Sequence, residues 1–259
     1  GLGDVYKRQF PLYFRFIKKL AHAAAKAGVK KTAIAVFAGT AVFLCANTLY
    51  ISSVYPPTGD EPHYLLIAES ISKDFDINLE NDYVHEKSYS KFYPGVLEHE
   101  NLHNIKGKGN AGVYSIHQPG TALLVLPFYF LLGKAGAQLF MSLLAAVLAA
   151  FVFLICADMN TGLKTAVGAG ACCAAFSPVV FNSSLVLTEL PGAVIAAGLF
   201  IFAGQKFTAM RRFLFFGGIA VLPWIHFKLI VFSVIFYCLH YIRIIKGRRF
   251  NLKGEAVNN

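Results

Sequence analysis

Apolar residues occur along the chain in long blocks that polar segments separate. Residues 33–54 form the first block, and its length is close to the roughly 20 apolar residues that a helix needs to cross a bilayer core. Three later blocks are of similar or shorter length, residues 135–157, 165–181 and 190–205, and a fourth, residues 213–240, is longer. This pattern predicts an all-α fold, that of a polytopic transmembrane helical protein.

The last block is too long for one crossing, and the Pro223-Trp224 pair interrupts it. A proline inside a helix removes a backbone hydrogen bond and breaks or kinks the helix. We therefore predict two short helices here, with residues 224–228 at the outer turn. This interpretation gives six crossings in total.

The polar stretch after the first block predicts a long extracytoplasmic loop, residues 55–118, that carries interfacial helices. Long loops in compact proteins are commonly functional. Residues 119–133 are apolar but short for a crossing, and they include the aromatic run Phe128-Tyr129-Phe130. Because helices of this kind can lie in the plane of the membrane interface, we predict an interfacial helix over residues 119–133.

Composition supports the membrane assignment, because 56% of the residues are hydrophobic and only 15% are charged. The net charge of +10 comes from basic residues that cluster at the ends of apolar blocks. Such clusters mark the cytoplasmic side, so we expect residues 10–32 to be a cytoplasmic basic N-terminus and expect no nucleic-acid partner. We also expect residues 1–9 to be a non-native scar, residues 33–249 to form the membrane module and residues 250–259 to be a polar tail.

An acidic pair, Asp60-Glu61, follows the first predicted crossing. Acids beside a membrane helix are costly to keep unless they have a use. A partly desolvated carboxylate can act as a general base, so we assign catalysis to Asp60, with Glu61 in support. The structural alternative is a helix start, since Pro62 and the two acids also suit the first turn of a helix and its dipole.

Polar side chains in three further segments fall on the same predicted side of the membrane. Glu189 begins an apolar block, and an acid at that place is a candidate site residue. His117 before the interfacial helix, and His226 and Lys228 in the last outer turn, are candidates for binding a phosphate. The structural alternatives are solvation of His117 at the headgroups and snorkelling of Lys228.

His99-Glu100-Asn101-Leu102-His103 matches the H-E-x-x-H pattern, which in metalloproteases places two zinc ligands and a general base on one helix. Gly95 precedes the match, and Gly107 and Gly109 follow it, which does not favour a rigid helix. A membrane zinc metalloprotease that uses His99, Glu100 and His103 is kept as an alternative.

The order of these features resembles the GT-C class of membrane glycosyltransferases, which includes the protein O-mannosyltransferases of family 39 and the aminoarabinose lipid A transferases. The shared layout is a cytoplasmic N-terminus, one crossing, a long outer loop that opens on an acidic pair, and an interfacial helix. The matching segments are residues 114–120, residues 123–127, Glu189 and the Pro223-Trp224-Ile225-His226-Phe227-Lys228 turn. The resemblance extends over about residues 32–249.

The resemblance implies transfer of a sugar from a polyprenyl-phosphate donor to a lipid, glycan or protein acceptor, outside the plasma membrane of a bacterium. It places the role of the base on Asp60. We expect no metal or other cofactor, and we expect this chain to be the N-terminal module of a longer enzyme. A transporter or flippase of a lipid-linked or anionic substrate is the other alternative; it predicts polar residues at mid-membrane depth, and the apolar blocks contain few.

Overall fold

The computed structural model describes residues 2–84, 87–98, 103–159, 161–204 and 207–255, and 78% of the chain is helical. The α-helices are α1 (Leu2–Val54), α2 (Glu61–Asp74), α3 (Glu80–Val84), α4 (Gly120–Asp158), α5 (Leu163–Ala175), α6 (Ser177–Ser183), α7 (Glu189–Ala203), α8 (Ala209–Ile225) and α9 (Ile230–Glu255). Short 3-10 turns are η1 (Ser88–Lys91), η2 (Lys108–Asn110) and η3 (Phe227–Leu229), and the strands β1 (Asn104–Lys106) and β2 (Val113–Ser115) form a hairpin. The helical class is confirmed, and the hairpin is an addition that the sequence analysis did not predict.

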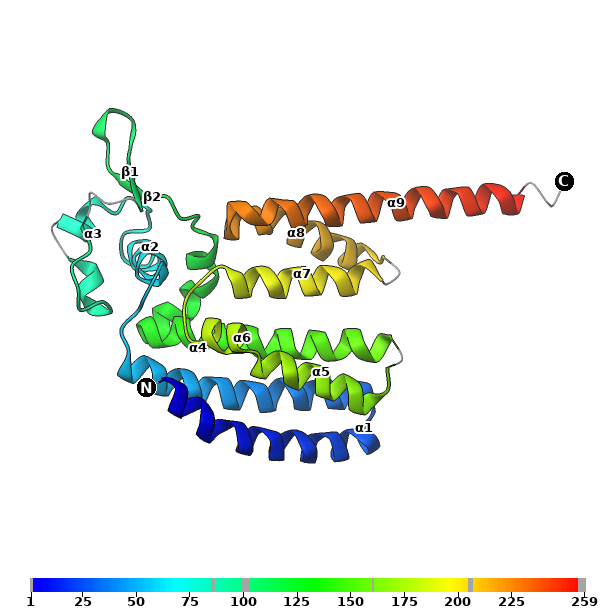
Figure 1. Cartoon of the computed structure of the whole chain (residues 1–259). Helices are drawn as coiled ribbons and strands as arrows, with labels where there is room; N and C mark the ends of the chain where they lie inside the picture. Colours follow the sequence, from blue (N-terminus) through cyan, green and yellow to red (C-terminus); the bar gives the residue numbers. More distant parts are fainter. Residues whose placement is uncertain (1, 85–86, 99–102, 160, 205–206, 256–259) are drawn as a thin grey trace.

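The long helices form a bundle, and the elements of the long loop gather at one end of it (Figure 1). Helix α4 packs against α1, α5 and α7, and α8 packs against α7 and α9. Helix α2 lies across the end of the bundle and contacts α4, while α3 and the β1–β2 hairpin lie further out.

Three helices are long and apolar enough to cross a membrane: Gly28–Val54, Gly120–Asp158 and Phe227–Ile245. The pair α5 and α6, bent by 58°, would make a fourth if it is one span. Helices α7 and α8 have 15 and 17 residues, which is short of the roughly 20 that a crossing needs. The six-crossing topology therefore stays a prediction.

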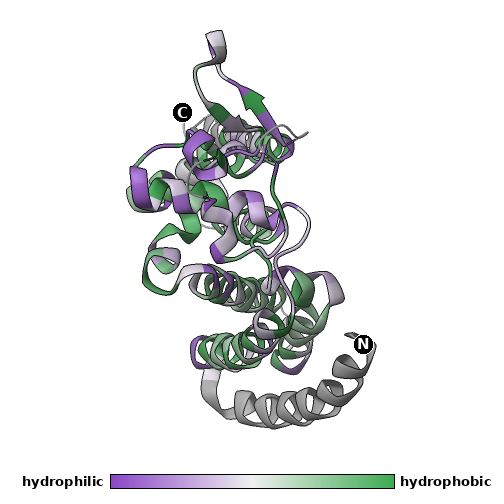
Figure 2. Ribbon diagram, turned by 90° about the vertical axis from the view of Figure 1, so that its left-hand side faces the viewer, coloured by the Kyte–Doolittle hydropathy of each residue, from purple (hydrophilic) through white to green (hydrophobic). Residues whose placement is uncertain are grey.

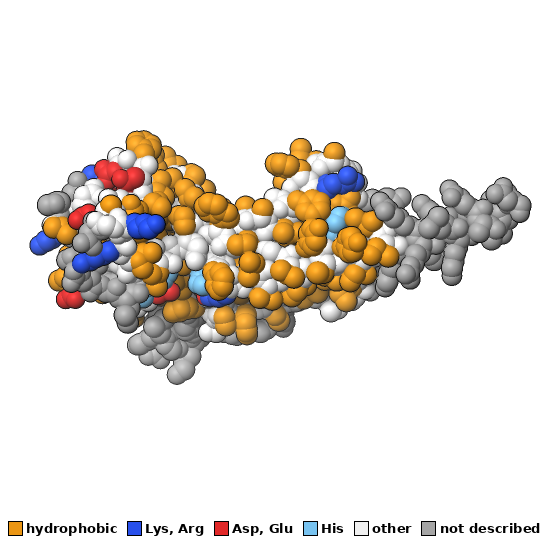
Figure 3. All heavy atoms as spheres, turned by 90° about the horizontal axis from the view of Figure 1, so that it is seen from above, with side chains coloured by type: hydrophobic (Ala, Val, Ile, Leu, Met, Phe, Trp, Pro, Cys, Tyr) orange, Lys and Arg blue, Asp and Glu red, His pale blue; other side chains and the backbone are white. Residues whose placement is uncertain are grey.

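The bundle exposes large apolar side chains, as a lipid-facing surface does. Val42, Phe130 and Phe213 are each more than 70% exposed. The helices of the bundle are largely hydrophobic along their length, whereas the elements of the loop end are more hydrophilic (Figure 2). In the space-filling view, hydrophobic side chains spread over the bundle, and most of the visible acidic side chains lie at the loop end (Figure 3).

Helix α4 is too long to cross a membrane as one straight helix. Its 39 residues would extend about 58 Å at 1.5 Å per residue, nearly twice the roughly 30 Å of a bilayer core. Gly133, at φ 58° and ψ −142°, breaks the helix, and a Cβ atom at Gly136 would lie 2.0 Å from the carbonyl oxygen of Phe128. Residues 120–132 and 134–158 are thus two helices in close contact, and the break falls where the predicted interfacial helix ends.

Buried hydroxyl groups connect the bundle helices near the loop end. Ser142 Oγ lies 2.8 Å from Thr48 Oγ1 and 2.9 Å from the carbonyl oxygen of Ser183. These contacts join α4, α1 and α6. The buried residues of α2, among them Tyr64 and Leu65, pack on the same part of α4, so the bundle holds α2 in a fixed position.

Candidate active site

The two acids of the Asp60-Glu61 pair lie at the start of α2 but face different surroundings. Gly59 precedes them at φ 62°, a conformation that glycine adopts without strain. Glu61 is fully buried, and its Oε1 accepts hydrogen bonds from Gln138 Nε2 at 2.8 Å and from the backbone N–H of Val186 at 3.0 Å. Asp60 is accessible to solvent and lies next to two histidines of the long loop.

Burial raises the pKa of Glu61 to about 7, while the bonds from Gln138 and Val186 and the positive charge of Lys134 act in the opposite direction. The second oxygen of Glu61, Oε2, is buried without a hydrogen-bond partner among the described residues. A buried oxygen without a partner costs less in a neutral carboxyl group than in a charged one. Glu61 therefore ties the start of α2 to α4 and to the segment before α7.

The β1–β2 hairpin brings together two histidines that are far apart in the sequence. Asn104 pairs with Ser115 in the hairpin. The next pair of residues, His103 and Ile116, continues this register, because the N–H of Ile116 donates a hydrogen bond to the carbonyl oxygen of His103 at 2.9 Å. His117 follows directly, and its Nε2 lies 3.2 Å from His103 Nδ1. A ligand atom of Asp60 lies within 4.8 Å of both.

A third histidine, His63 from α2, stacks on this pair. Its ring lies 4.2 Å from that of His103 at an angle of 20°, and 5.5 Å from that of His117. Its Nδ1 faces the hydroxyl of Tyr83 at 3.5 Å. Burial in the first place, together with the two neighbouring histidines, lowers the pKa of His63 to about 4 against the attraction of Asp60. At neutral pH the His63 ring is therefore uncharged.

The sequence analysis did not assign His63, Tyr64 or Tyr83 to the site. Tyr64, which follows His63 in α2, places its ring 4.9 Å from that of His117. Glycines at positions 107, 109 and 112, between short runs with Ile105 and Val113, are a hairpin signal that would have placed His103 and His117 at the two ends of one hairpin. No comparable signal marks the tyrosines.

Glu189 and Lys228 form an ion pair with an Oε1–Nζ distance of 2.6 Å, and about half of each side chain is exposed. Glu189 is the first residue of α7, and Lys228 lies in η3, where α8 ends. His226 Nδ1 accepts the backbone N–H of Lys228 at 3.1 Å, so the ring proton of a neutral His226 is on Nε2. Burial and the charge of Lys228 lower the pKa of His226, while Glu189 and Asp60 act to raise it.

The start of α4 touches the turn that carries His226. A Cβ atom at Gly120 would lie 2.2 Å from the carbonyl oxygen of Trp224 and 2.8 Å from the nitrogen of Ile225. Only glycine allows this approach, because both atoms belong to the backbone. The contact brings the end of the long loop, with His117, next to the turn of residues 224–228.

The negative charge of Asp60 acts on both His117 and His226. Burial lowers the pKa of His117, and His103 and His226 lower it as well, against the attraction of Asp60. Five of the six residues predicted from the sequence therefore gather at one end of the bundle: Asp60, His117, Glu189, His226 and Lys228. Glu61, the sixth, belongs to the same end but points into the bundle.

The H-E-x-x-H segment lies mostly outside the described residues, which omit positions 99–102. Its described member, His103, is a turn residue that directly precedes β1. It contacts His63 and His117, so its place in the structure comes from the hairpin.

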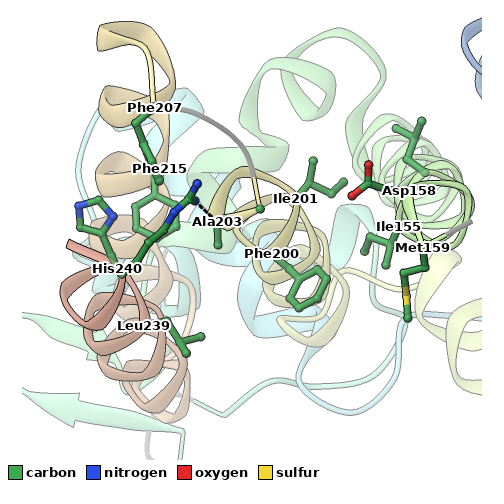
Figure 4. A pocket seen from close by; sticks show the side chains of 13 residues that line it. Ile155, Asp158, Met159, Phe200, Ile201, Ala203, Phe207, Phe215, Leu239 and His240 are labelled. Carbon is green, nitrogen blue, oxygen red and sulfur yellow. Dashed lines mark hydrogen bonds between the residues drawn. The ribbon is translucent and has the colours of Figure 1, made fainter. Parts of the chain in front are cut away.

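A cavity of about 560 Å³ lies between α4, α7, α8 and α9 (Figure 4). Its lining is mainly apolar and includes Phe200, Phe215 and Leu239, with Asp158 and Arg243 among the charged groups. These residues come from the ends of α4 and α7, the first half of α8 and the middle of α9, at the end of the bundle away from Asp60. The cavity is therefore separate from the candidate active site.

No protein-family model matches the chain, and comparisons with curated proteins and with solved structures found no significant match. The fold and the site by themselves define a helical protein with three helices long and apolar enough to cross a membrane. At one end of its bundle it carries a cluster of carboxylates, imidazoles and a lysine.

Proposed function

We propose that the chain is a membrane glycosyltransferase, or the N-terminal module of one, that transfers a sugar from a polyprenyl-phosphate donor at the outer face of a bacterial plasma membrane. The observation that supports this proposal most is the arrangement around Asp60. A solvent-accessible acid lies within electrostatic range of His117 and His226. The half-exposed Lys228 also acts on His226. A base and groups that bind an anion thus occur together at the end of an apolar bundle.

This arrangement suits the chemistry of the transfer. An acceptor hydroxyl attacks the anomeric carbon of the donor, and its proton passes to the carboxylate of Asp60. The bond between that carbon and the phosphate oxygen breaks, and the polyprenyl phosphate leaves as an anion. Lys228 supplies positive charge to the leaving phosphate, and a neutral His226 can donate its Nε2–H.

Glu189 has a different part in this scheme. Its carboxylate holds Lys228 at 2.6 Å and so keeps the ammonium group at the site before the donor binds. The ion pair is half exposed, which makes it weak, so a phosphate can compete for the lysine. The prenyl chain of the donor would lie against the apolar, outward-facing side chains of the bundle.

The transporter alternative predicts polar residues within the spans, and the structure contains more of them than the sequence analysis allowed. Thr48, Gln138 and Ser142 are buried in the bundle. However, they bond to one another, to the carbonyl oxygen of Ser183 and to Glu61. Groups that are paired within the protein serve its packing, so we favour the transferase.

The test uses the full chain in liposomes with a panel of donors, each a polyprenyl phosphate that carries a radiolabelled sugar. The measured quantity is the release of polyprenyl phosphate with an envelope extract as the source of acceptor. We expect Asp60→Asn to abolish release and Glu80→Gln, which neutralises an exposed acid of the same loop, to leave it unchanged. Full release by Asp60→Asn would contradict the assignment.

Binding of the polyprenyl phosphate gives a second readout that does not require turnover. Trp224 is the only tryptophan, it is 62% exposed, and it lies close to Lys228 in the chain. We expect its fluorescence to change on titration with a polyprenyl phosphate and the affinity to fall in Lys228→Ala. Lys108→Ala, at an exposed position of the hairpin turn, is the matched control, and equal affinities in all three proteins would contradict a phosphate site at Lys228.

A further inference from the structure

Asp60, His103 and His117 come from three separate segments, yet one potential ligand atom of each lies within 4.8 Å of the other two. Asp60 precedes α2, His103 precedes β1, and His117 follows β2. The sequence analysis linked His103 only to the H-E-x-x-H match and expected no metal. The fold gives His103 two partners that this pattern does not include.

The distance between the two imidazoles suits a shared cation. His103 Nδ1 and His117 Nε2 are 3.2 Å apart. In a tetrahedral zinc site with Zn–N bonds of about 2.0–2.1 Å, two ligand nitrogens lie roughly 3.3–3.4 Å apart. The pair is therefore already spaced as one edge of such a site, and the carboxylate of Asp60, within 4.8 Å of both nitrogens, is the candidate for the third ligand.

We propose that Asp60, His103 and His117 bind a divalent transition-metal ion, Zn²⁺ in the first place. Two imidazoles and one carboxylate are the donor set of catalytic zinc sites that keep their fourth position open for water or substrate. Imidazole nitrogen suits zinc and its neighbours in the transition series, whereas Mg²⁺ and Ca²⁺ take oxygen ligands. The inferred ion is therefore of the zinc type.

The surroundings of the two histidines hold them in place, as metal ligands require. The hairpin fixes His103 through the hydrogen bond from the N–H of Ile116 to its carbonyl oxygen. Ser115 Oγ accepts the backbone N–H of His117 at 3.1 Å. His63 supports the ring of His103 by stacking, and its own Nδ1 faces Tyr83, so His63 is a positioning residue.

The alternative is that the three histidines only pack the hairpin against α2. Stacked imidazoles with a hydrogen bond between them would then need no ion. The two interpretations differ in stoichiometry, because packing alone predicts no saturable metal binding that depends on His103 and His117. They do not differ in fold, so the metal has to be measured directly.

An ion at this position would also bear on the transfer reaction, and this consequence rests on the proposed function. One of its ligands, His117, lies within electrostatic range of His226, which is on the same turn as Lys228, where a phosphate oxygen of the donor would bind. Asp60 has two carboxylate oxygens, so one can bind the ion while the other receives the acceptor proton. Binding of the ion itself is independent of transfer and is measured without any donor.

The experiment uses the full chain, purified in detergent with a tag that contains no histidine and stripped with EDTA. Zn²⁺ is added, the excess is removed by dialysis, and the bound metal is measured by elemental analysis; Co²⁺ replaces Zn²⁺ for a visible spectrum. We expect one Zn²⁺ per chain and a tetrahedral Co²⁺ spectrum. The affinity for Zn²⁺ should fall in His103→Gln and in His117→Gln. Because these residues are direct ligands, the loss should exceed the roughly 10–100-fold that removal of a hydrogen-bond partner of a metal ligand costs.

One control variant and one pair of variants separate the metal site from packing. The control, His240→Ala, removes a histidine from α9, far along the chain from the cluster, and should keep one Zn²⁺. The pair tests the positioning role of His63: His63→Ala should weaken Zn²⁺ binding by roughly 10–100-fold, and His63→Phe, which keeps a ring for stacking, should restore most of that loss. The melting temperature in EDTA shows that each variant is folded, and Zn²⁺ should raise it in the wild type but not in His103→Gln.

The proposal is overturned if the wild type binds no Zn²⁺ above the level of His103→Gln, or if folded His103→Gln and His117→Gln both keep one equivalent. Because these measurements need no donor, a failure here leaves the transferase assignment standing. Conversely, stoichiometric Zn²⁺ in a protein that turns over no donor would support the metal site and contradict only the proposed function.

Discussion

Replacement of Glu61 by glutamine should remove a pH dependence from the stability of this protein. The Glu61 side chain is fully buried, and its Oε2 has no hydrogen-bond partner among the described residues. Burial raises its pKa from 4.5 to about 7. Glutamine has nearly the same shape, and its carbonyl oxygen can still accept the hydrogen bonds from Gln138 and Val186.

The sign of the effect follows from the protons bound in each state. Between pH 4.5 and 7 the folded protein keeps a proton on Glu61, whereas the unfolded chain has released it. The free energy of unfolding therefore falls as the pH rises through this window and levels off above it. A shift of this size at 1.36 kcal/mol per pKa unit corresponds to about 3 kcal/mol.

The assay is thermal unfolding in detergent at pH 5 and pH 8, followed by tyrosine and tryptophan fluorescence. EDTA is present, so that no ion bound near Asp60 contributes. The lowered pKa values of the histidines act in the opposite direction, but they act equally in both proteins. At roughly 2–4 °C per kcal/mol for a chain of this size, we therefore expect the melting temperature of the wild type to fall by roughly 6–12 °C relative to that of Glu61→Gln between the two pH values. Glu61→Gln should be the more stable protein at pH 8.

Two variants define the controls. Glu80→Gln neutralises an exposed acid and should follow the wild type at both pH values. Glu61→Ala removes the acceptor of Gln138 and Val186 and should be less stable than Glu61→Gln at every pH, because two buried donors lose their partner. The reasoning is refuted if Glu61→Gln keeps the pH dependence of the wild type, or if it is the less stable protein at pH 8.

Two further predictions concern the contacts that assemble the site. Gly120→Ala should lower stability by about 1–3 kcal/mol, because its Cβ would meet the backbone of Trp224 and Ile225. The control Gly217→Ala, with open space around its Cβ, should not lower stability. Equal melting temperatures for the two variants would contradict the close approach. Lys228→Ala should change stability by less than about 1 kcal/mol, since the ion pair of Lys228 with Glu189 is half exposed. The same substitution should abolish sugar transfer. A large loss of stability would mean that the ion pair is structural.

The apolar blocks were enough to predict the helical bundle, because burial in lipid sets both the length and the composition of a helix. They also placed a boundary between residues 119–133 and residues 135–157, and the structure breaks α4 at Gly133, between these two segments. Helix α7 nearly coincides with the block of residues 190–205, and α8 ends at Ile225, next to the predicted interruption at Pro223-Trp224. The blocks did not indicate that Gly136 packs against the backbone of Phe128 across the break in α4. Hydrophobicity gives the extent of an apolar segment but not the path of the chain within it.

The predicted crossings alternate in direction, and this placed Asp60, His117, Glu189 and the turn of residues 224–228 on one side of the predicted membrane. In the structure these residues lie at one end of the bundle. The part of the site that the sequence analysis missed depends on strand register, which places His103 opposite Ile116 and next to His117. A shift of one residue would turn these side chains to the other face of the hairpin. The glycine-rich turn predicts a hairpin, but not which residues lie opposite one another.

The different surroundings of Asp60 and Glu61 have a consequence for the chemistry. Adjacent residues on a helix point about 100° apart, so a pair at a helix start can present one side chain to the bundle and the other to solvent. Since Glu61 is largely neutral below pH 7, Asp60 is the acid of the pair that acts on His117 and His226. The two roles are therefore separable: Glu61→Gln should alter the pH dependence of melting and retain Zn²⁺, whereas Asp60→Asn should weaken Zn²⁺ binding and retain that pH dependence. If both substitutions changed both properties, the acids would act as one unit, and the assignment of separate roles would be wrong.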